Sequence, residues 1–133
     1  MNSCSFNPSR VWMEMTHMPN IDGYQFGRMT IGGKLDTTDL VILYTGIVMD
    51  NWIRKSGHFL EYDDIKHLIT SEPEIIIIGT GVYGRMKVAK DLLSRFKGLD
   101  IEVEILSNEQ ALTVYNKKIR ETQKVGACFH LTC

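Results

Sequence analysis

Four consecutive isoleucines, Ile75 to Ile78, end abruptly in glycine, and this run constrains the fold more than any other part of the chain. A strand that exposes one face to water alternates apolar and polar side chains, whereas this run does not alternate. We therefore expect protein to cover both faces of the strand, as in the middle of an α/β sheet. With 133 residues, 44% of them apolar, the chain is long enough for one such domain.

Helices and strands are predicted to alternate after the isoleucine run. We expect a helix from Met86 to Lys97, a half-exposed strand over 101–105 near a sheet edge, a helix over 109–123 and a last strand over 125–131. Gly98 stands where a C-cap glycine would end the first helix. Ser107 and Gln110 have the spacing of a capping box before the second. This alternating order of strands and helices predicts parallel strands joined by right-handed crossovers.

The pattern in the first half of the sequence predicts antiparallel β structure. Residues 24–31 alternate in polarity, Gly32-Gly33 suits a turn, and residues 40–45 could supply a partner strand. A weaker strand pattern covers 11–15. A short helix follows Tyr62, with Asp63 and Asp64 in its first turn and an apolar face made of Ile65, Leu68 and Ile69. The segment 46–59 has no clear pattern.

These elements predict an α/β fold. We expect a single three-layer domain over residues 1–133, with a small central mixed or parallel sheet, helices packed on it, and an antiparallel β subdomain from the N-terminal half. Residues 1–20 would form an N-terminal extension that is weakly ordered at its tip.

Composition limits the classes of partner that we expect and indicates the cellular compartment. The 15 basic and 16 acidic residues give a formal charge of -1, which offers no electrostatic case for nucleic acid or a membrane surface. No apolar run approaches the roughly 18 to 20 residues that a membrane span requires. Three cysteines, without a signal-peptide pattern, predict free thiols in a reducing compartment, and so a cytoplasmic protein.

Gly79, Gly81 and Gly84 form a G-x-G-x-x-G motif where the isoleucine strand should turn into helix. Three interpretations stay open: a tight structural turn, a site for an anion or small ligand, and a dinucleotide site. The dinucleotide site lacks its acidic residue, because the next strand finishes Ile105-Leu106-Ser107. No Gly-Lys-Ser/Thr follows, which excludes a Walker A loop.

Other polar residues complete a hypothetical ligand-binding cleft. Trp52, Arg54, Lys55 and His58 share the segment 46–59, where they could line a site or only cover the core edge and cap a turn. Tyr115-Asn116 lies within a helix and should make a functional or a structural hydrogen bond. The predicted cleft residues are Gly79, Thr80, Gly81, Arg85, Trp52, His58, Tyr115 and Asn116.

The remaining reactive side chains give no catalytic or metal-binding pattern. The histidines and cysteines lack metal-ligand spacing, and no Ser/His/Asp or Cys/His arrangement is visible, so we expect no metal, cofactor or catalytic residue. His67 should be solvated on its helix. Cys128 should be a buried, inert thiol. The reactivity of Cys133 stays open.

A longer pattern resembles the Mth-type domain over about residues 21–133. It consists of Ile21-x-x-Tyr24-x-Phe26-Gly27, Trp52, His58, Ile78-Gly79-Thr80-Gly81, Ile101-x-Val103, Glu109-Gln110-Ala111, Tyr115-Asn116 and Val125-Gly126-x-x-Phe129-His130-x-Thr132-Cys133. The family includes an adipogenesis-associated small cytoplasmic branch, which the closing segment resembles most, and a mitochondrial complex I assembly factor. Gly84 has no counterpart in the family turn.

The resemblance implies a three-layer α/β fold with a cleft near the Gly-x-Gly turn, and no established reaction. It favours a non-catalytic cytosolic module for interaction, assembly or regulation, with other proteins of unknown identity as partners and homodimer formation left open. The alternative is a protein or enzyme that binds a small anion or nucleotide at the Gly-x-Gly turn.

Overall fold

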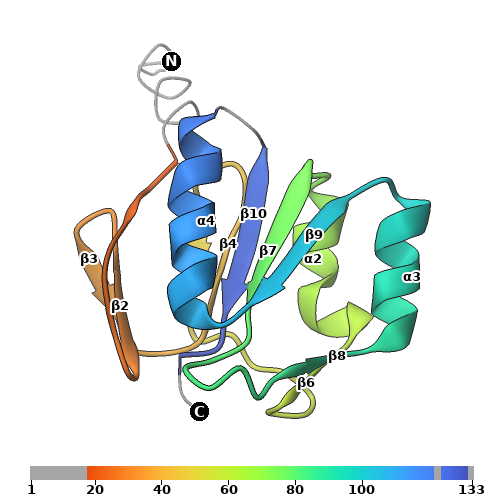
Figure 1. The fold of residues 1–133 in the computed structure, drawn as a ribbon, viewed down its shortest axis with the longest axis horizontal. Helices are drawn as coiled ribbons and strands as arrows, with labels where there is room; N and C mark the ends of the chain where they lie inside the picture. The colour runs from red at the N-terminus through yellow and green to blue at the C-terminus, as the bar shows by residue number, and fades with distance from the viewer. Residues whose placement is uncertain (1–17, 122–123, 132–133) are drawn as a thin grey trace.

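The computed structural model describes residues 18–121 and 124–131 as a three-layer α/β fold (Figure 1). Its central layer is a five-stranded mixed sheet, in the order β5-β4-β10-β7-β9. The strands of this sheet are β4 (Leu40–Ile42), β5 (Val48–Met49), β7 (Ile75–Gly79), β9 (Glu102–Leu106) and β10 (Val125–Phe129). As expected, β9, β7 and β10 are parallel neighbours and β9 lies at an edge, while β4 runs antiparallel to β10.

The isoleucine run is the middle of the molecule, as its lack of alternation predicted. All four side chains in β7 are fully buried. Ile75 and Ile77 pack into the core on one face of the sheet, and Ile76 and Ile78 into the core on the other.

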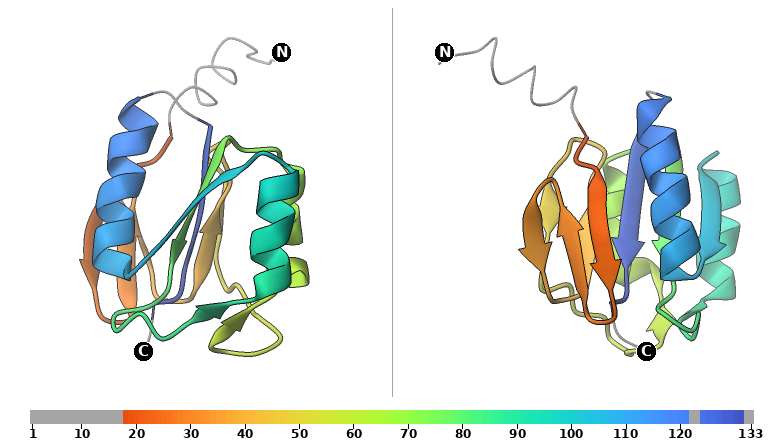
Figure 2. Two further views of the ribbon diagram at one scale, coloured as in Figure 1. Left: turned by 45° about the vertical axis from the view of Figure 1, so that its right-hand side comes forward. Right: turned by 60° about the vertical axis from the view of Figure 1, so that its left-hand side comes forward.

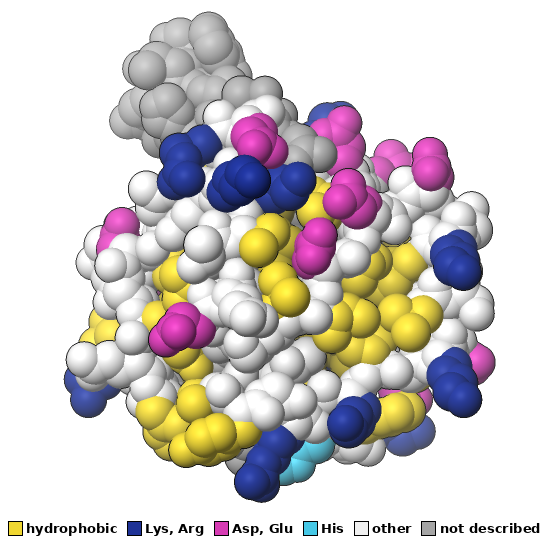
Figure 3. All heavy atoms as spheres, in the orientation of Figure 1, with side chains coloured by type: hydrophobic (Ala, Val, Ile, Leu, Met, Phe, Trp, Pro, Cys, Tyr) yellow, Lys and Arg dark blue, Asp and Glu magenta, His cyan; other side chains and the backbone are white. Residues whose placement is uncertain are grey.

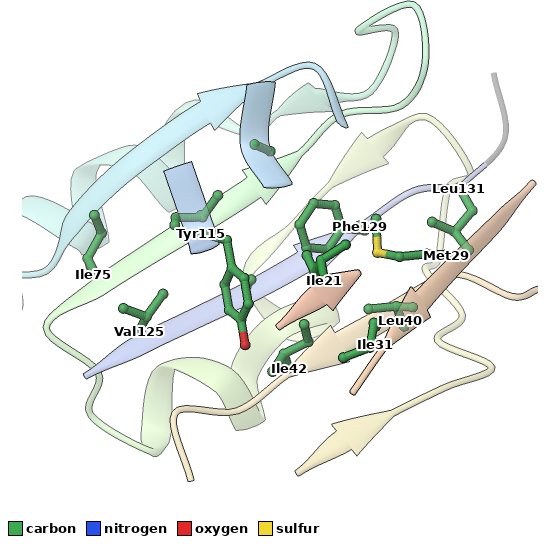
Figure 4. Close-up of a cluster of buried hydrophobic side chains, with 13 residues drawn as sticks. Ile21, Met29, Ile31, Leu40, Ile42, Ile75, Tyr115, Val125, Phe129 and Leu131 are labelled. Carbon is green, nitrogen blue, oxygen red and sulfur yellow. The ribbon is translucent and has the colours of Figure 1, made fainter. Parts of the chain in front are cut away.

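An antiparallel sheet and the longest helix cover the first face. The sheet consists of β1 (Ile21–Gln25), β2 (Arg28–Ile31) and β3 (Lys34–Asp36), and the helix is α4 (Asn108–Arg120). Figure 2 shows these elements beside the central sheet. Met29, Tyr115 and Phe129 meet in the core between the layers (Figure 4).

Short helices cover the second face. They are the 3-10 helix η1 (Tyr62–Ile65), α2 (Lys66–Thr70) and α3 (Lys90–Gly98). Ile65, Leu68 and Ile69 are buried, as their spacing predicted, and they pack in one cluster with Leu92 and Phe96 of α3. A parallel pair, β6 (Phe59–Leu60) and β8 (Lys87–Val88), lies below α3 in Figure 1.

The strands of the N-terminal half differ from the prediction in two ways. Residues 24–31 are not one strand, because Gly27 adopts a φ of 76° and turns the chain between β1 and β2. Residues 40–45 do not pair with them. Leu40–Ile42 instead joins the central sheet beside β10, and β3 is the partner of β2 after the expected glycine turn. The predicted strand over 11–15 lies outside the described residues.

The helix predicted from Met86 begins only at Lys90. Lys87 donates its N–H to the His58 carbonyl (2.8 Å) and Ala89 donates to the Leu60 carbonyl (2.9 Å), so pairing with a distant segment makes residues 87–88 a strand. Val88 and Ala89 therefore precede the helix. Within the helix, Leu93 is 38% exposed.

Two predicted helix ends also differ in detail. Gly98 is the last residue of α3 rather than its C-cap. The left-handed backbone conformation that ends the helix is adopted by Asp100, two residues later, with a φ of 58°. Ser107 is the N-cap residue of α4, but its side chain makes no capping hydrogen bond. Within residues 18–121 and 124–131, every helix is too short or too polar to cross a bilayer.

Candidate functional site

The carboxyl ends of β7, β9 and β10 lie at one end of the central sheet, which we call the carboxyl end. In α/β folds, ligands bind outside the carboxyl ends of the strands. The turn after β7, Asn108 after β9 and His130 after β10 all lie here. Because β4 is antiparallel to β10, Asp39 at its start reaches the same place.

Asn108, which is fully buried, holds the glycine turn in place. Its Oδ1 accepts a hydrogen bond from the Gly81 N–H (3.0 Å), and its own N–H donates to the Gly81 carbonyl (3.0 Å). Its Nδ2 donates to the His130 carbonyl (2.6 Å) and to the Tyr24 hydroxyl (3.0 Å). One amide side chain thus joins the turn to the ends of β1 and β10.

Each glycine of the motif has a steric reason to be glycine. A Cβ on Gly79 would lie 2.5 Å from Asn108 Oδ1 and 2.5 Å from Phe129 Cδ1. Gly81 and Gly84 adopt φ angles of 109° and 65°, which L side chains rarely adopt.

The turn lacks the geometry of a phosphate-binding loop. The N–H groups of Thr80, Gly81 and Gly84 all donate to protein atoms. The next helix, α3, starts six residues after Gly84, so no helix N-terminus opens directly from the turn. Of the three interpretations of the motif, this geometry favours the structural turn.

An open depression of about 480 Å³ lies beside the turn. Thr80 and Gly84 line it together with Ser107 and Gln110 at the start of α4. Arg85 is exposed and does not line it. The Arg85 guanidinium lies instead over the ring of Tyr83, 5.6 Å from its centroid.

The most unusual feature of the carboxyl end is a buried ionic cluster of Asp39, Arg54 and His130. Asp39 Oδ2 lies 2.8 Å from Arg54 Nη2 and 2.8 Å from His130 Nδ1, and these two nitrogens are 2.9 Å apart. The Arg54 and His130 side chains are only 4% and 6% exposed. Charged groups are almost never buried this far without partners.

Three donors converge on the Asp39 carboxylate. Burial alone would raise its pKa, but hydrogen bonds from the Leu131 N–H, His130 and Arg54 outweigh burial, so the pKa of Asp39 is lowered from its usual value. Since the carboxylate is ionised and can only accept, His130 Nδ1 carries a proton and donates it to Asp39.

Arg54 also gives the unpredicted segment 46–59 its shape. Its Nε and Nη2 donate to the Gly57 carbonyl (3.2 and 2.8 Å), and its guanidinium stacks on Trp52, 4.6 Å from the ring centroid. Trp52 is half-buried against the core, and its Nε1 donates to the Asp64 carbonyl (2.8 Å). The exposed His58 ring meets His130 edge-on at 5.4 Å.

Cys128 lies near this cluster in β10. It is fully buried, and burial raises the pKa of its thiol to about 12. Arg54 lowers this pKa and Asp39 raises it, both by smaller amounts than burial does. The thiol is therefore protonated at neutral pH, as expected of a buried, inert cysteine. The prediction for His67 was wrong, because this side chain is half-buried and its Nε2 is shielded from solvent without a hydrogen-bond partner.

Tyr115 and Asn116 hold the N-terminal strand rather than joining the glycine turn. The Tyr115 hydroxyl donates to the Pro19 carbonyl (2.9 Å), and burial raises the pKa of Tyr115. The Asn116 amide bonds the Ile21 backbone in both directions, at 2.9 and 3.0 Å. Of the two roles left open for Asn116, these bonds support the structural one.

The structure thus divides the predicted cleft residues into separate groups. Gly79, Thr80 and Gly81 form the turn, whereas Trp52 and His58 flank the ionic cluster. Sequence reasoning did not select Asp39, Asn108 or His130 as site residues. Asp39 directly precedes β4, His130 directly follows β10, and Asn108 is the first residue of α4, two residues after β9. Within residues 18–121 and 124–131, no three His, Cys, Asp or Glu side chains are grouped so that they could hold a metal ion.

Solved structures of similar fold cover most of the chain. MT938 is 27% identical over 86% of this chain and 99% of that chain, with a TM-score of 0.72. An outer membrane protein from Bartonella henselae is 18% identical over 90% of this chain and 99% of that chain, with a TM-score of 0.74. A Mth938-like domain from Bordetella pertussis is 14% identical over 85% of each chain, with a TM-score of 0.60. These likenesses show the fold and not an activity.

A family model described as "Protein of unknown function (DUF498/DUF598)" matches residues 21–130. This range includes the glycine turn and all three members of the ionic cluster. The expected Mth-type domain is consistent with the Mth938-like neighbour. The chain therefore belongs to the DUF498/DUF598 family.

Proposed function

We propose that this protein is a non-catalytic interaction module that binds another protein through the carboxyl end of its sheet. The observation that carries the proposal is the contrast between two neighbours in sequence. Ile53 is 78% exposed, while the adjacent Arg54 side chain is 4% exposed and is hydrogen-bonded to Asp39 and Gly57. A buried ionic cluster thus holds a loop that exposes the large apolar side chain of Ile53.

Other exposed apolar side chains lie at the same end. We use the name apolar rim for Phe26, Ile53, Phe59 and Tyr83, which come from the β1–β2 turn, the segment 46–59, β6 and the β7–β8 loop. Figure 3 shows hydrophobic side chains gathered at the lower edge, where the β1–β2 turn and the β7–β8 loop lie in Figure 1. Exposed apolar groups concentrated in one place are typical of protein-binding surfaces.

Hydrogen bonds connect two segments of the rim, those that carry Phe26 and Ile53, to each other. Gly27, next to Phe26, donates its N–H to the Leu131 carbonyl (2.9 Å), and the Leu131 N–H donates to Asp39 (2.8 Å). Asp39 in turn holds Arg54, next to Ile53. A surface fixed before binding loses less conformational entropy when a partner docks, which favours apolar anchor residues of this kind.

We also infer a finer placement within the family and the cell. The closing segment from Val125 to Cys133 supports the adipogenesis-associated branch over the complex I assembly branch. A cytoplasmic location is part of this inference. Fractionation of cells that express the full chain tests it, and recovery in the mitochondrial fraction would contradict it.

The interaction proposal is tested by affinity capture with matched variants. We expect Ile53→Ser and Tyr83→Ser to lose the specific partner that the wild-type chain retains. Ile47→Ser is the control, because Ile47 is also an exposed isoleucine (55%) but lies in the β4–β5 turn at the opposite end of the sheet. All three variants should keep the wild-type circular dichroism spectrum. Equal capture by Ile53→Ser and Ile47→Ser would contradict the proposal.

The alternative function, binding of a small anion or nucleotide, is supported only by the depression beside Thr80 and Gly84. A ligand at 100 times its dissociation constant should stabilise the fold by about 2.7 kcal/mol. A thermal-shift screen of nucleotides, phosphates and carboxylates therefore tests it. Stabilisation by a nucleotide that is abolished in Thr80→Val would favour this alternative over the interaction module.

A further inference from the structure

Two hydrogen-bonding atoms of the ionic cluster have no partner among the described residues. They are Arg54 Nη1 and His130 Nε2, and both are shielded from solvent. Buried polar atoms in native proteins nearly always have a protein, water or ligand partner. Stacking on Trp52 engages only the face of the guanidinium. Nε and Nη2 are already hydrogen-bonded, so the N–H groups of Nη1 are the ones that stay available.

The covalent geometry of the two side chains limits how far apart these atoms lie. Arg54 Nη2 and His130 Nδ1 are 2.9 Å apart, and each side chain is rigid and planar. The second nitrogens, Nη1 and Nε2, therefore lie within about 7 Å of each other. The two oxygens of one carboxylate, each with a hydrogen bond of about 2.8 Å, can span this separation.

The charges of the cluster select the ligand. Arg54 and Asp39 cancel each other, and His130 already donates its Nδ1 proton to Asp39. To donate to an anion as well, His130 Nε2 must take up a second proton, which adds one positive charge. The other titratable groups nearby are the exposed His58 ring and the protonated Cys128 thiol. One added proton balances a single negative charge, which favours a monoanion over a dianion.

We propose that Arg54 Nη1 and His130 Nε2 together bind one carboxylate group, and that His130 takes up a proton when the carboxylate binds. The ligand would enter beside His58, whose exposed ring meets His130 edge-on, and Gly57, around which the space is open. This site is separate from the glycine turn, and it does not depend on the apolar rim or on a protein partner.

The direct test is an NMR titration of the imidazole nitrogens of the wild-type chain with formate and with acetate. We expect saturable changes at His130 Nε2 at a one-to-one ratio and uptake of about one proton, measured by calorimetry in buffers of different ionisation enthalpy. Sulfate should bind at least tenfold more weakly. The affinity for formate should fall as pH rises, because binding takes up a proton.

Variants with matched controls separate the carboxylate site from general salt effects. Arg54→Lys and His130→Gln should abolish formate binding. His67→Gln should leave it unchanged, because His67 also has a buried, unpartnered Nε2 but lies in α2 and is not a member of the ionic cluster. His58→Ala, which alters only an exposed side chain, should speed association without loss of affinity.

Two peptide ligands distinguish the source of the carboxylate. If a short peptide with a free C-terminal carboxylate binds and its C-terminal amide does not, the natural ligand is the end of a chain. If only formate and acetate bind, it is a free small acid. The proposal is overturned if formate and acetate leave the His130 nitrogens of the wild-type chain unchanged, which would indicate that only water contacts them. This measurement does not require any variant to fold.

Discussion

Asp39 joins three distant parts of the chain through one carboxylate. It accepts hydrogen bonds from the Leu131 N–H, His130 and Arg54, and the last two are 91 and 15 positions away in the sequence. The segments after β10 and after β5 therefore depend on it for their positions.

The lowered pKa of Asp39 predicts how stability depends on pH. A carboxyl group whose pKa is lower in the folded state stabilises the fold above its unfolded pKa of about 3.9, and this stabilisation is lost as pH falls from there through the folded pKa. Asp39→Asn should remove this part of the acid dependence. At neutral pH it should lower the free energy of unfolding by roughly 3 to 5 kcal/mol, because Arg54 is left buried without a counter-charge.

Urea unfolding of the wild type and Asp39→Asn across acidic and neutral pH measures both effects. The difference in unfolding free energy between the two proteins should shrink as pH falls below about 4. A difference that stays constant over this range would contradict the assigned role of Asp39.

Gly79→Ala should be destabilising by about 1 to 3 kcal/mol, because the new Cβ would lie 2.5 Å from Asn108 and Phe129 atoms. Gly98→Ala is the matched control. No atom outside its own helix lies within 4 Å of a Cβ at Gly98, and alanine favours helix, so that variant should be neutral or stabilised by up to about 1 kcal/mol. Thermal unfolding of both variants tests the prediction. A loss of stability in Gly98→Ala but not in Gly79→Ala would contradict it.

Elements of the fold could be predicted from sequence where local pattern decides them. The isoleucine run identified β7 as a central strand, and the spacing of Ile65, Leu68 and Ile69 identified the buried side of the short helix after Tyr62. The start of α3 could not be found in this way. Lys87-Val88 is strand only because β6, almost thirty residues earlier, pairs with it.

The same distinction explains the candidate site. The glycine motif was visible because its members are close in sequence, and Trp52 and His58 stood out within one segment. The ionic cluster was not visible, since Arg54 and His130 are 76 positions apart and meet only through the order of strands in the sheet. A histidine after one strand and an aspartate before its antiparallel neighbour give no local signal.

The start of α4 and the glycine turn should behave as one unit, because Asn108 joins them. Asn108→Ala leaves the Gly81 N–H and the His130 carbonyl without their partner, which should cost at least about 3 kcal/mol of unfolding free energy. Hydrogen exchange at the Gly81 amide should accelerate more than exchange at the Thr80 amide, which donates to Leu106. Equal acceleration of both amides would indicate general destabilisation instead.

The whole molecule separates its stabilising layers from its proposed binding surface. The cores on the two faces of the sheet are made largely of buried aliphatic and aromatic side chains. The buried ionic groups concentrate at the carboxyl end, beside the apolar rim. Buried ion pairs generally contribute little net stability. Because these groups lie next to the exposed Ile53, we infer that they hold the binding surface in place rather than stabilise the core.

The most direct test of this account is the hydrogen-exchange footprint of the captured partner on the wild-type chain. We predict protection in residues 52–59 and 81–85, which contain Ile53, Phe59 and Tyr83, and none in residues 44–48 at the opposite end of the sheet. Protection restricted to the β9 edge, or to β2 and β3, would contradict the claim that the ionic cluster positions the carboxyl end for a protein partner.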